Sequence, residues 1–375
     1  MLLTKVIIAP DSFKGALTST QVADIIATEI NEAFPDCEII KMPIADGGEG
    51  SVETILSSVG GTVHEATVLS PDEKEIIASY GISKNGTAIL EMAQSSGITR
   101  QNGLHPMTST TYGFGQLILA ALERGVNDFM LCIGGSATTD GGCGMASALG
   151  IRFLDELGNR FIPCGETLKM IKNIDITGSI DRIKNLANSR FTVMCDVDNP
   201  LFGERGAAYV YSPQKGANPA QVKILDEGLR HYSAVLTKKF GTDFSDIPGA
   251  GAAGGLGAGC VAFLGAKLKS GIEAILKLND FENQVADADL IITGEGKLDS
   301  QSFQGKVLSG LIQNAKGVPV WSICGFCDAN EAQLRESNLI VFETSEDITV
   351  EESIKESSKY LRLAAKKAMR YADSI

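Results

Sequence analysis

Five short hydrophobic runs, two near the N-terminus and three near the C-terminus, constrain the fold of this 375-residue chain more than any other feature. Each run is rich in β-branched residues and ends at small or acidic ones, as buried parallel strands do. The runs are VIIA (6–9), CEIIKM (37–42), DLIITG (289–294), VPVWSIC (318–324) and LIVFE (339–343). Amphipathic helical patterns lie between them, and a last one is predicted over about Val350 to Tyr371. Alternating strands and helices predict an open parallel sheet covered on both faces, the doubly wound class of α/β fold.

The middle of the chain follows a different pattern. Three runs, ATVLS, IIASYGIS and TAILEM, are separated by the turn sequences PDEK and KNG and indicate antiparallel strands. A chain of 375 residues also exceeds the size at which one hydrophobic core usually stops growing. We therefore predict that residues 1–66 and 288–375 form a discontinuous flavodoxin-like domain, and that residues 67–287 form a second α/β domain inserted into it.

The composition narrows the choice of partners. Apolar residues make up 44% and charged residues 21%, which is typical of a globular protein, and the formal net charge is −13. Such an acidic chain argues against nucleic acid and acidic membranes as partners, because both are bound by basic surfaces. The N-terminal sequence runs into a strand without the pattern of a signal peptide, so we expect a cytoplasmic location. The sequence does not decide the oligomeric state, and a homo-oligomer is possible.

Acidic residues, glycines and lysines follow three of the predicted parallel strands. In an open α/β sheet the ligand binds outside the carboxyl ends of the strands, so these loops are expected to meet at one edge. Phosphoryl transfer needs these residue types, because backbone N–H groups and lysines hold phosphate oxygens while carboxylates hold Mg²⁺ or accept a proton. The candidates are Asp11, Ser12 and Lys14 after the first strand, Asp46, Gly47, Gly48 and Glu49 after the second, and Gly294, Glu295 and Asp299 after the third.

Two segments of the middle domain add candidates. The glycine-rich stretch GGSATTDGGCGMASALG (134–150) opens as a loop and closes as a helix, which suits either an oxyanion site or close packing. In CDVDNP (195–200), an apolar strand brings Asp196, Asp198 and Asn199 to its end, and the two carboxylates share a face if the strand continues. Turn formation explains the same Asp-Asn-Pro sequence, so both interpretations stay open.

Other nucleotide-binding and catalytic motifs are incomplete, absent or outside the structural context that they require. The pairs Gly296-Lys297 and Gly305-Lys306 lack the leading glycine and trailing hydroxyl of a Walker A loop. The segment GAGAAG (249–254) matches the dinucleotide fingerprint but follows no strand, which disfavours an NAD-dependent oxidoreductase. No G-x-S-x-G is present, which disfavours a serine hydrolase. A non-catalytic anion-binding or regulatory protein remains an alternative, because loop glycines also serve packing.

Eight blocks of the sequence together closely resemble the type I glycerate kinases. They are collinear and span nearly the whole chain: APDSFKG (9–15), PIADGGEG (43–50), TTYGFGQLI (110–118), IGGSATTDGGCGMASALG (133–150), CDVDNPL (195–201), SPQKGA (212–217), PGAGAAGGLGAG (248–259) and ITGEGKLDSQSFQGK (292–306). The resemblance implies ATP-dependent phosphorylation of D-glycerate to 2- or 3-phosphoglycerate, with Mg²⁺. It also implies a flavodoxin-like domain interrupted by an α/β domain that resembles a restriction-endonuclease fold.

The resemblance and the strand-end pattern together assign expected roles. Asp196 is the expected base for the glycerate hydroxyl, with Asp46 as its rival, and Asp140 is a weaker candidate. Glu295 and Asp299 are expected to bind Mg²⁺ directly or through water. Lys14 and Lys306 would neutralise phosphate or the substrate carboxylate, and Gly134, Gly135, Ser136 and Thr138 would hold phosphate oxygens. Further substrate or phosphate contacts are expected from Asp11, Ser12, Gly47, Gly48, Glu49, Asp198, Asn199 and Gly294.

Overall fold

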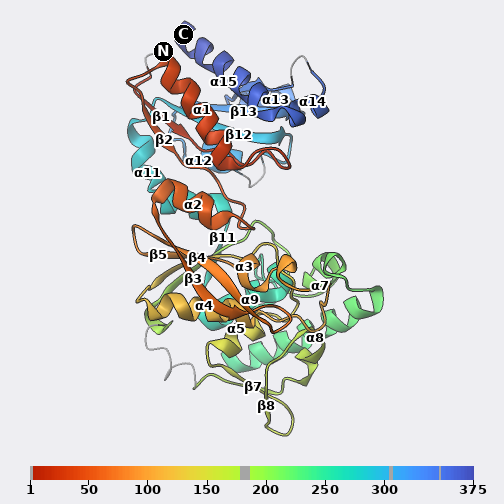
Figure 1. Cartoon of the computed structure of the whole chain (residues 1–375). Coiled ribbons are helices and arrows are strands. Elements are labelled where there is room, and N and C mark those ends of the chain that lie inside the picture. Colours follow the sequence, from red (N-terminus) through yellow and green to blue (C-terminus); the bar gives the residue numbers. More distant parts are fainter. Residues whose placement is uncertain (1–2, 178–185, 304–306, 346–347) are drawn as a thin grey trace. The chain divides into compact units, whose positions relative to one another are not determined.

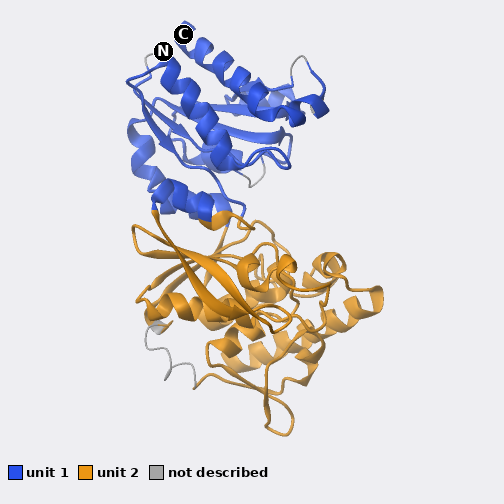
Figure 2. Cartoon of the chain, viewed as in Figure 1, with its two compact units in different colours: residues 1–46, 53–60, 270–375 blue, residues 47–52, 61–269 orange. Residues whose placement is uncertain are grey.

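The computed structural model describes residues 3–177, 186–303, 307–345 and 348–375. The chain forms two compact α/β units (Figure 2). Unit 1 contains residues 1–46, 53–60 and 270–375, and unit 2 contains residues 47–52 and 61–269. Both chain ends therefore belong to unit 1, and the middle of the sequence forms unit 2.

The sheet of unit 1 is parallel, with the strand order β14-β13-β12-β1-β2. Its strands are β1 (Lys5–Ile8), β2 (Glu38–Lys41), β12 (Leu290–Leu298), β13 (Val320–Cys327) and β14 (Ile340–Glu343). In β1, Val6 lies opposite Ile39 of β2 on one side and Leu290 of β12 on the other. The five strands predicted from the hydrophobic runs are thus confirmed, and they join the two ends of the chain.

Both faces of this sheet are buried. Helices α1 (Ser19–Ala33) and α15 (Ser357–Ser374) lie side by side on one face (Figure 1), where Val6 and Ile8 pack in the same core. Ile7 and Ile291 are also fully buried, and their side chains point to the opposite face because alternate strand residues do. The other helices of unit 1 are α10 (Gly271–Leu278), α11 (Phe281–Gln284), α12 (Val307–Asn314), α13 (Glu331–Glu336) and α14 (Val350–Lys355).

Unit 2 is built on a mixed six-stranded sheet with the order β11-β10-β6-β5-β4-β3. Strands β5 (Thr87–Glu91), β6 (Asp128–Cys132), β10 (Arg190–Met194) and β11 (Lys267–Lys269) are parallel. Strands β3 (Gly61–Leu69) and β4 (Glu75–Ser83) are antiparallel, as predicted for this part of the chain. The core of this layer includes residues of α4 (Tyr112–Glu123) and α9 (Ala252–Leu264).

A second hydrophobic core in unit 2 involves the long helix α8 (Pro219–Phe240) and a small antiparallel sheet. This sheet contains β7 (Arg152–Leu154), β8 (Arg160–Phe161) and β9 (Asn173–Asp175). Tyr232 of α8 is fully buried, and its hydroxyl donates a hydrogen bond to Gly141 O at 3.1 Å. The remaining helices are α3 (Met92–Ser96), α5 (Cys143–Ala148) and α7 (Ala207–Tyr211), and α2 (Ser51–Val59) begins in unit 2 and continues in unit 1.

Several elements differ from the sequence expectation. Strands β12 and β13 extend to Leu298 and Cys327, so part of the predicted loop after the third strand is strand. The predicted C-terminal helix is interrupted at Glu356, whose φ of −116° and ψ of 36° are not helical. The compact units place residues 61–66 with unit 2 and residues 270–287 with unit 1. The boundaries 1–66 with 288–375 and 67–287 stay a prediction about the domains.

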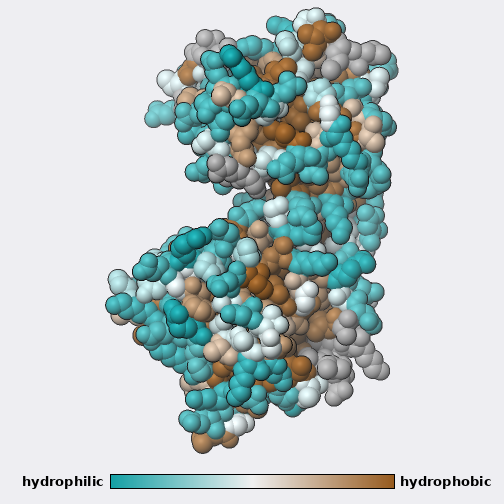
Figure 3. Space-filling model, turned by 180° about the vertical axis from the view of Figure 1, so that it is seen from behind, coloured by the Kyte–Doolittle hydropathy of each residue, from teal (hydrophilic) through white to brown (hydrophobic). Residues whose placement is uncertain are grey.

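The surface is dominated by polar side chains. On the face drawn in Figure 3, hydrophilic residues cover most of each unit and hydrophobic residues show through in smaller patches. Within the described part of the chain, no helix combines the length and the apolar character that crossing a bilayer requires. The cytoplasmic location and the oligomeric state stay predictions.

Candidate functional site

A cavity of about 470 Å³ lies at the carboxyl ends of the strands of unit 1. It gathers five of the residues that the strand-end argument selected: Asp11, Ser12, Lys14, Glu295 and Asp299. The rest of its lining comes from the loop after β1, from the ends of β12 and β13, and from the segments after β14: Phe13, Ala16, Gly296, Lys297, Gly325, Phe326, Thr344, Ser353, Ile354 and Ser357. These residues therefore share one cavity at the edge where ligands bind in open α/β sheets, and their role stays a prediction.

Asp11 is held in place by the neighbouring strand. Its N–H donates to Gly294 O at 2.8 Å, and its Oδ1 accepts from the Ser12 N–H at 2.6 Å. Burial raises the pKa of Asp11, as does the negative charge of Asp46, whereas the Ser12 hydrogen bond and Lys14 act in the opposite direction. Asp46 therefore lies close enough to Asp11 for their charges to interact, although it follows a different strand.

Glu295 and Asp299 are linked through a serine that the sequence analysis did not select. The Ser302 hydroxyl donates to Glu295 Oε2 at 2.8 Å and accepts from the Asp299 N–H at 3.2 Å. Across the described ranges, no three His, Cys, Asp or Glu side chains gather as a metal site. Two carboxylates nevertheless fit Mg²⁺, which is usually bound by one or two carboxylates together with waters and substrate phosphates. Lys306 lies outside the described residues.

Unit 2 brings its own candidates to the carboxyl ends of β5, β6 and β10. The loop from Gly47 to Val52 is fastened there, because the Gly134 N–H donates to Gly47 O at 2.9 Å. Glu91, the last residue of β5, accepts from the N–H groups of Gly50 at 3.2 Å and Val52 at 2.5 Å. Gly48 and Glu49 lie within this loop, where Gly48 is half-buried and Glu49 is exposed.

Glu91 is a site residue that the sequence reasoning missed. Burial raises its pKa, three hydrogen bonds oppose this, and the charge of Glu49 adds to the increase. The signal was available, since Glu91 ends the predicted strand TAILEM and the strand-end rule selects such acids. That rule was applied to the parallel strands, whereas this run was interpreted as antiparallel.

Much of the glycine-rich stretch is committed to packing. The Gly135 carbonyl accepts from the Ile98 N–H at 3.0 Å, and the Ala137 N–H donates to Ser96 O at 3.0 Å. A Cβ at Gly134 would meet Gly47 O at 2.9 Å, so the approach of the two loops requires glycine. Thr138 is fully buried, and Ser136 is 9% exposed. Of these predicted phosphate contacts, Ser136 has the side chain nearest to solvent.

Asp140 holds this stretch together from inside. Its carboxylate is fully buried and accepts from the Thr111 N–H, the Thr111 hydroxyl, the Gly142 N–H and the Gly144 N–H, at 2.8 to 3.1 Å. Burial raises the pKa of Asp140, and these hydrogen bonds act against it. The arrangement is that of a structural clamp.

Lys215 is a buried cation behind the same loop. It is 2% exposed, and its Nζ donates to Ser136 Oγ at 2.7 Å and to Thr138 O at 2.6 Å. Burial lowers the pKa of Lys215 from 10.5 to about 7, against the effect of the Asp140 charge. Lys215 belongs to the block SPQKGA (212–217), but nothing in its sequence neighbours indicates that this lysine is buried.

The titration of Lys215 predicts how stability depends on pH. Between pH 7 and 9, the free energy of unfolding of the wild type should rise relative to that of Lys215→Met, by up to about 1.4 kcal/mol per pH unit. The reason is that the unfolded chain keeps the Lys215 proton in this range while the folded chain, with a pKa of about 7, releases it. Urea denaturation at several pH values tests this. Parallel curves would contradict it, and Lys238→Met, at an exposed lysine of α8, is the control.

The CDVDNP segment lies just after β10 and not in it. The strand ends at Met194, so Asp196 and Asp198 are exposed loop residues. Asp198 pairs with Arg205 at 3.4 Å. The Asn199 Nδ2 donates to Arg205 O at 2.7 Å, and its Oδ1 accepts from the Tyr211 hydroxyl at 2.5 Å. Asn199 thus stabilises the loop, and Asp196 is exposed at the start of the loop.

The segment 249–254 packs against neighbouring backbone. A Cβ at Gly254 would lie 2.0 Å from Thr138 O, and one at Gly251 would lie 2.2 Å from Pro200 O. These contacts explain the glycines by close packing, as the lack of a preceding strand indicated.

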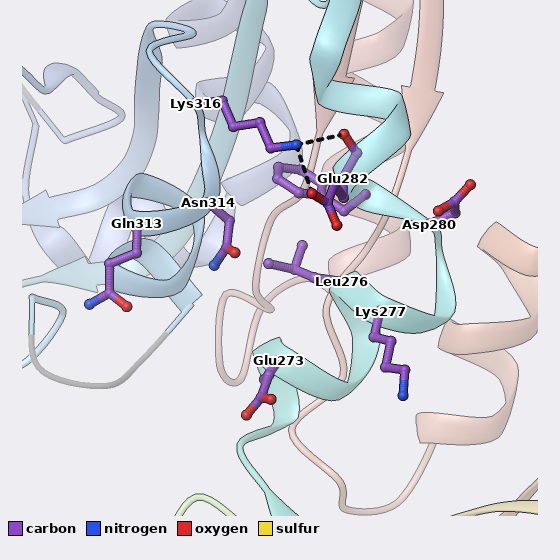
Figure 4. A pocket seen from close by; sticks show the side chains of 9 residues that line it. Glu273, Leu276, Lys277, Asp280, Glu282, Gln313, Asn314 and Lys316 are labelled. Carbon is purple, nitrogen blue, oxygen red and sulfur yellow. Dashed lines mark hydrogen bonds and ion pairs between the residues drawn. The ribbon is translucent and has the colours of Figure 1, made fainter.

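A second cavity of unit 1, of about 360 Å³, contains none of the predicted residues (Figure 4). It is lined by α10, α11 and the end of α12, which precede β12 and β13 in the chain. Lys316 reaches across part of it and donates to Glu282 O at 3.4 Å and Oε1 at 3.0 Å. This lining comes from segments that precede the strands and not from the loops that follow them, so it lies apart from the strand-end candidates.

Comparison with known proteins gives one family. The model described as the glycerate kinase family matches residues 6–373. The chain is 44% identical to the glycerate 2-kinase of Escherichia coli, over 86% of this chain and 85% of that protein. It is 41% identical to a glycerate kinase of Bacillus cereus, over 96% of each chain. A crystal structure named glycerate kinase 2, from Salmonella typhimurium LT2, matches with a TM-score of 0.86 and 38% identity, over 99% of each chain.

Proposed function

This chain belongs to the glycerate kinase family, and we propose that it transfers the γ-phosphate of ATP to the 2-hydroxyl group of D-glycerate. Family membership makes it a kinase, a phosphotransferase with an alcohol group as acceptor. The observation that supports the proposal most is the strand-end cavity of unit 1, which combines carboxylates, lysines and a serine in the way phosphoryl transfer requires. The choice of the 2-hydroxyl rests on the name of the 44% identical relative.

We propose that unit 1 has a flavodoxin-like fold. Numbered by their appearance within the sheet, its strands run 5-4-3-1-2, which is the flavodoxin order 2-1-3-4-5 read from the other edge. The likeness of unit 2 to a restriction-endonuclease fold is proposed from the family resemblance, and its mixed sheet with an antiparallel edge is compatible with it.

The unit 1 edge is proposed to bind the phosphates and Mg²⁺. Glu295 and Asp299 would hold the ion, and bound Mg²⁺ would neutralise charge on the phosphate oxygens. Lys14, and Lys306 outside the described residues, would contact the same oxygens. Asp11 and Ser12, fastened to Gly294, would orient this group.

The unit 2 edge is proposed to bind the acceptor. Asp196 takes the proton of the substrate hydroxyl as that oxygen bonds to the γ-phosphorus, while the bond from phosphorus to the β,γ-bridging oxygen breaks and ADP leaves. Asp46 is the alternative base. The Ser136 hydroxyl, whose oxygen accepts a hydrogen bond from Lys215, is proposed to donate a hydrogen bond to the substrate carboxylate. Gly47, Gly48, Glu49, Gly134, Gly135, Thr138, Asp198 and Asn199 would shape this site.

Phosphorus NMR tests the reaction and its position. The chain is incubated with ATP, Mg²⁺ and D-glycerate, and the expected products are ADP and 2-phosphoglycerate. The product signal should be a doublet, because the carbon at position 2 carries one hydrogen, whereas a triplet would identify the 3-phosphate and overturn that choice. Removing Mg²⁺ with a chelator should stop the reaction. If no phosphoglycerate forms, the chain is not a glycerate kinase, and a non-catalytic anion-binding protein becomes the better description.

A further inference from the structure

We infer that the unit 1 cavity is the nucleotide site and that the adenine base lies between Phe326 and Ile354, with the phosphates toward Asp11 and Glu295. This inference rests on the proposed function and adds the unit that binds ATP and the side chains that recognise its base. The lining of the cavity carries the argument.

The cavity has chemically different sides. The loop after β1 and the end of β12 with the loop after it supply charged residues, whereas Phe326 near the end of β13 and Ile354 of α14 supply apolar ones. Phe326 is 38% exposed and Ile354 is 52% exposed. Exposed apolar side chains that line a cavity suit contact with a flat, partly apolar group of a ligand, which would cover them. A nucleotide has this two-sided character, because its base is aromatic and its phosphates are charged.

The backbone that carries Phe326 is held by pairing with β12 before any ligand arrives. A Cβ at Gly325 would lie 2.3 Å from Gly296 O, so the ends of β12 and β13 are closely packed next to Phe326. The neighbouring wall is fixed as well, since the buried hydroxyls of Thr344 and Ser353 are 2.8 Å apart and join the end of β14 to α14. Preorganised aromatic surfaces bind bases by stacking, and stacking tolerates little movement.

The size and charge of the cavity favour a nucleotide over the smaller substrate. A volume of about 470 Å³ is in the range of cavities for molecules much larger than a three-carbon acid. Glycerate has no apolar face to cover Phe326. The carboxylates of Asp11, Glu295 and Asp299 would repel a bare anion, whereas they would attract phosphates that carry Mg²⁺.

Calorimetric titration with ADP and Mg²⁺ tests the inference without turnover. Phe326→Ala should weaken ADP binding by about tenfold or more, as expected for the loss of base stacking. Phe326→Trp should keep the affinity, and Ile354→Asp should lower it from the other wall. Inorganic tripolyphosphate with Mg²⁺, which has no base, should bind the wild type and Phe326→Ala equally. The matched control is Leu363→Ala, because Leu363 of α15 is 53% exposed but does not line the cavity.

The outcomes separate this inference from the proposed function. If Phe326→Ala and Ile354→Asp both bind ADP as tightly as the wild type, the base lies elsewhere and the inference fails, even if phosphoglycerate is formed. If both weaken ADP binding but no phosphoglycerate appears, the nucleotide site stands and the proposed reaction fails. A loss of tripolyphosphate binding in Phe326→Ala would overturn the assignment of this side chain to the base.

Discussion

Replacing Asp196 by Asn should lower kcat by about 10²- to 10⁴-fold and change the KM for D-glycerate only a few-fold, the range that general-base catalysis contributes. An amide has nearly the same size and still accepts hydrogen bonds, but it cannot take the hydroxyl proton. Asp196 is exposed at the start of its loop, so the change should leave the fold intact. Steady-state kinetics with saturating ATP measures kcat and KM separately, and circular dichroism verifies the fold.

Asp128→Asn is the matched control for this experiment. Asp128 is at the amino end of β6, away from the carboxyl ends of the strands, and pairs with the exposed Arg190 at 3.3 Å. Surface pairs of this kind contribute little, so the control should keep wild-type kinetics. If Asp196→Asn retains its kcat within tenfold, Asp196 is not the base. A loss of the predicted size in Asp46→Asn would then assign the role to Asp46.

Replacing Asp140 by Ala should lower the free energy of unfolding by about 3 to 5 kcal/mol. The carboxylate is fully buried and is the acceptor for four hydrogen bonds in the glycine-rich stretch. Without it, buried donors of Thr111, Gly142 and Gly144 lose their partner, and each such loss costs about 1 to 3 kcal/mol. Urea denaturation followed by circular dichroism measures the change.

Asp155→Ala separates burial from hydrogen bonding. Asp155 also accepts backbone N–H groups, from Leu157 at 2.9 Å and Asn159 at 2.8 Å, but it lies in an exposed turn where water replaces the lost acceptor. Its removal should therefore cost far less than the removal of Asp140. Equal losses in the two variants would show that burial of Asp140 contributes nothing, which contradicts the clamp described above.

The fold of unit 1 could be predicted from local pattern because its strands are buried on both faces. All five hydrophobic runs are strands, and residues at the carboxyl ends of β1, β12, β13 and β14 line one cavity. The length of the strands could not be predicted, since Glu295 and Lys297 are polar and are held in β12 by pairing with β13. Likewise, the break at Glu356 interrupts a continuous helical pattern for reasons that local sequence does not contain.

The candidate site was predictable where it follows strand ends and unpredictable where it depends on packing. Ser302 joins Glu295 and Asp299 through its hydroxyl, and Lys215 reaches Ser136 across 79 residues of sequence. No local pattern marks such partners. The sequence left an oxyanion site and close packing as two explanations of the glycine-rich stretch. Its hydrogen bonds to Gly47, Ser96 and Ile98 show that close packing explains many of these residues.

The position of β1 between β2 and β12 has a consequence for synthesis on the ribosome. β1 and β2 are made first, but β12, the other neighbour of β1, begins at Leu290. Unit 2 ends at Lys269, so its sheet can be completed before the remaining strands of unit 1 exist. Because domains fold as units during translation, the inserted unit should fold first, while two hydrophobic N-terminal strands wait for their partners. During that interval these strands are the part of the nascent chain most in need of a chaperone.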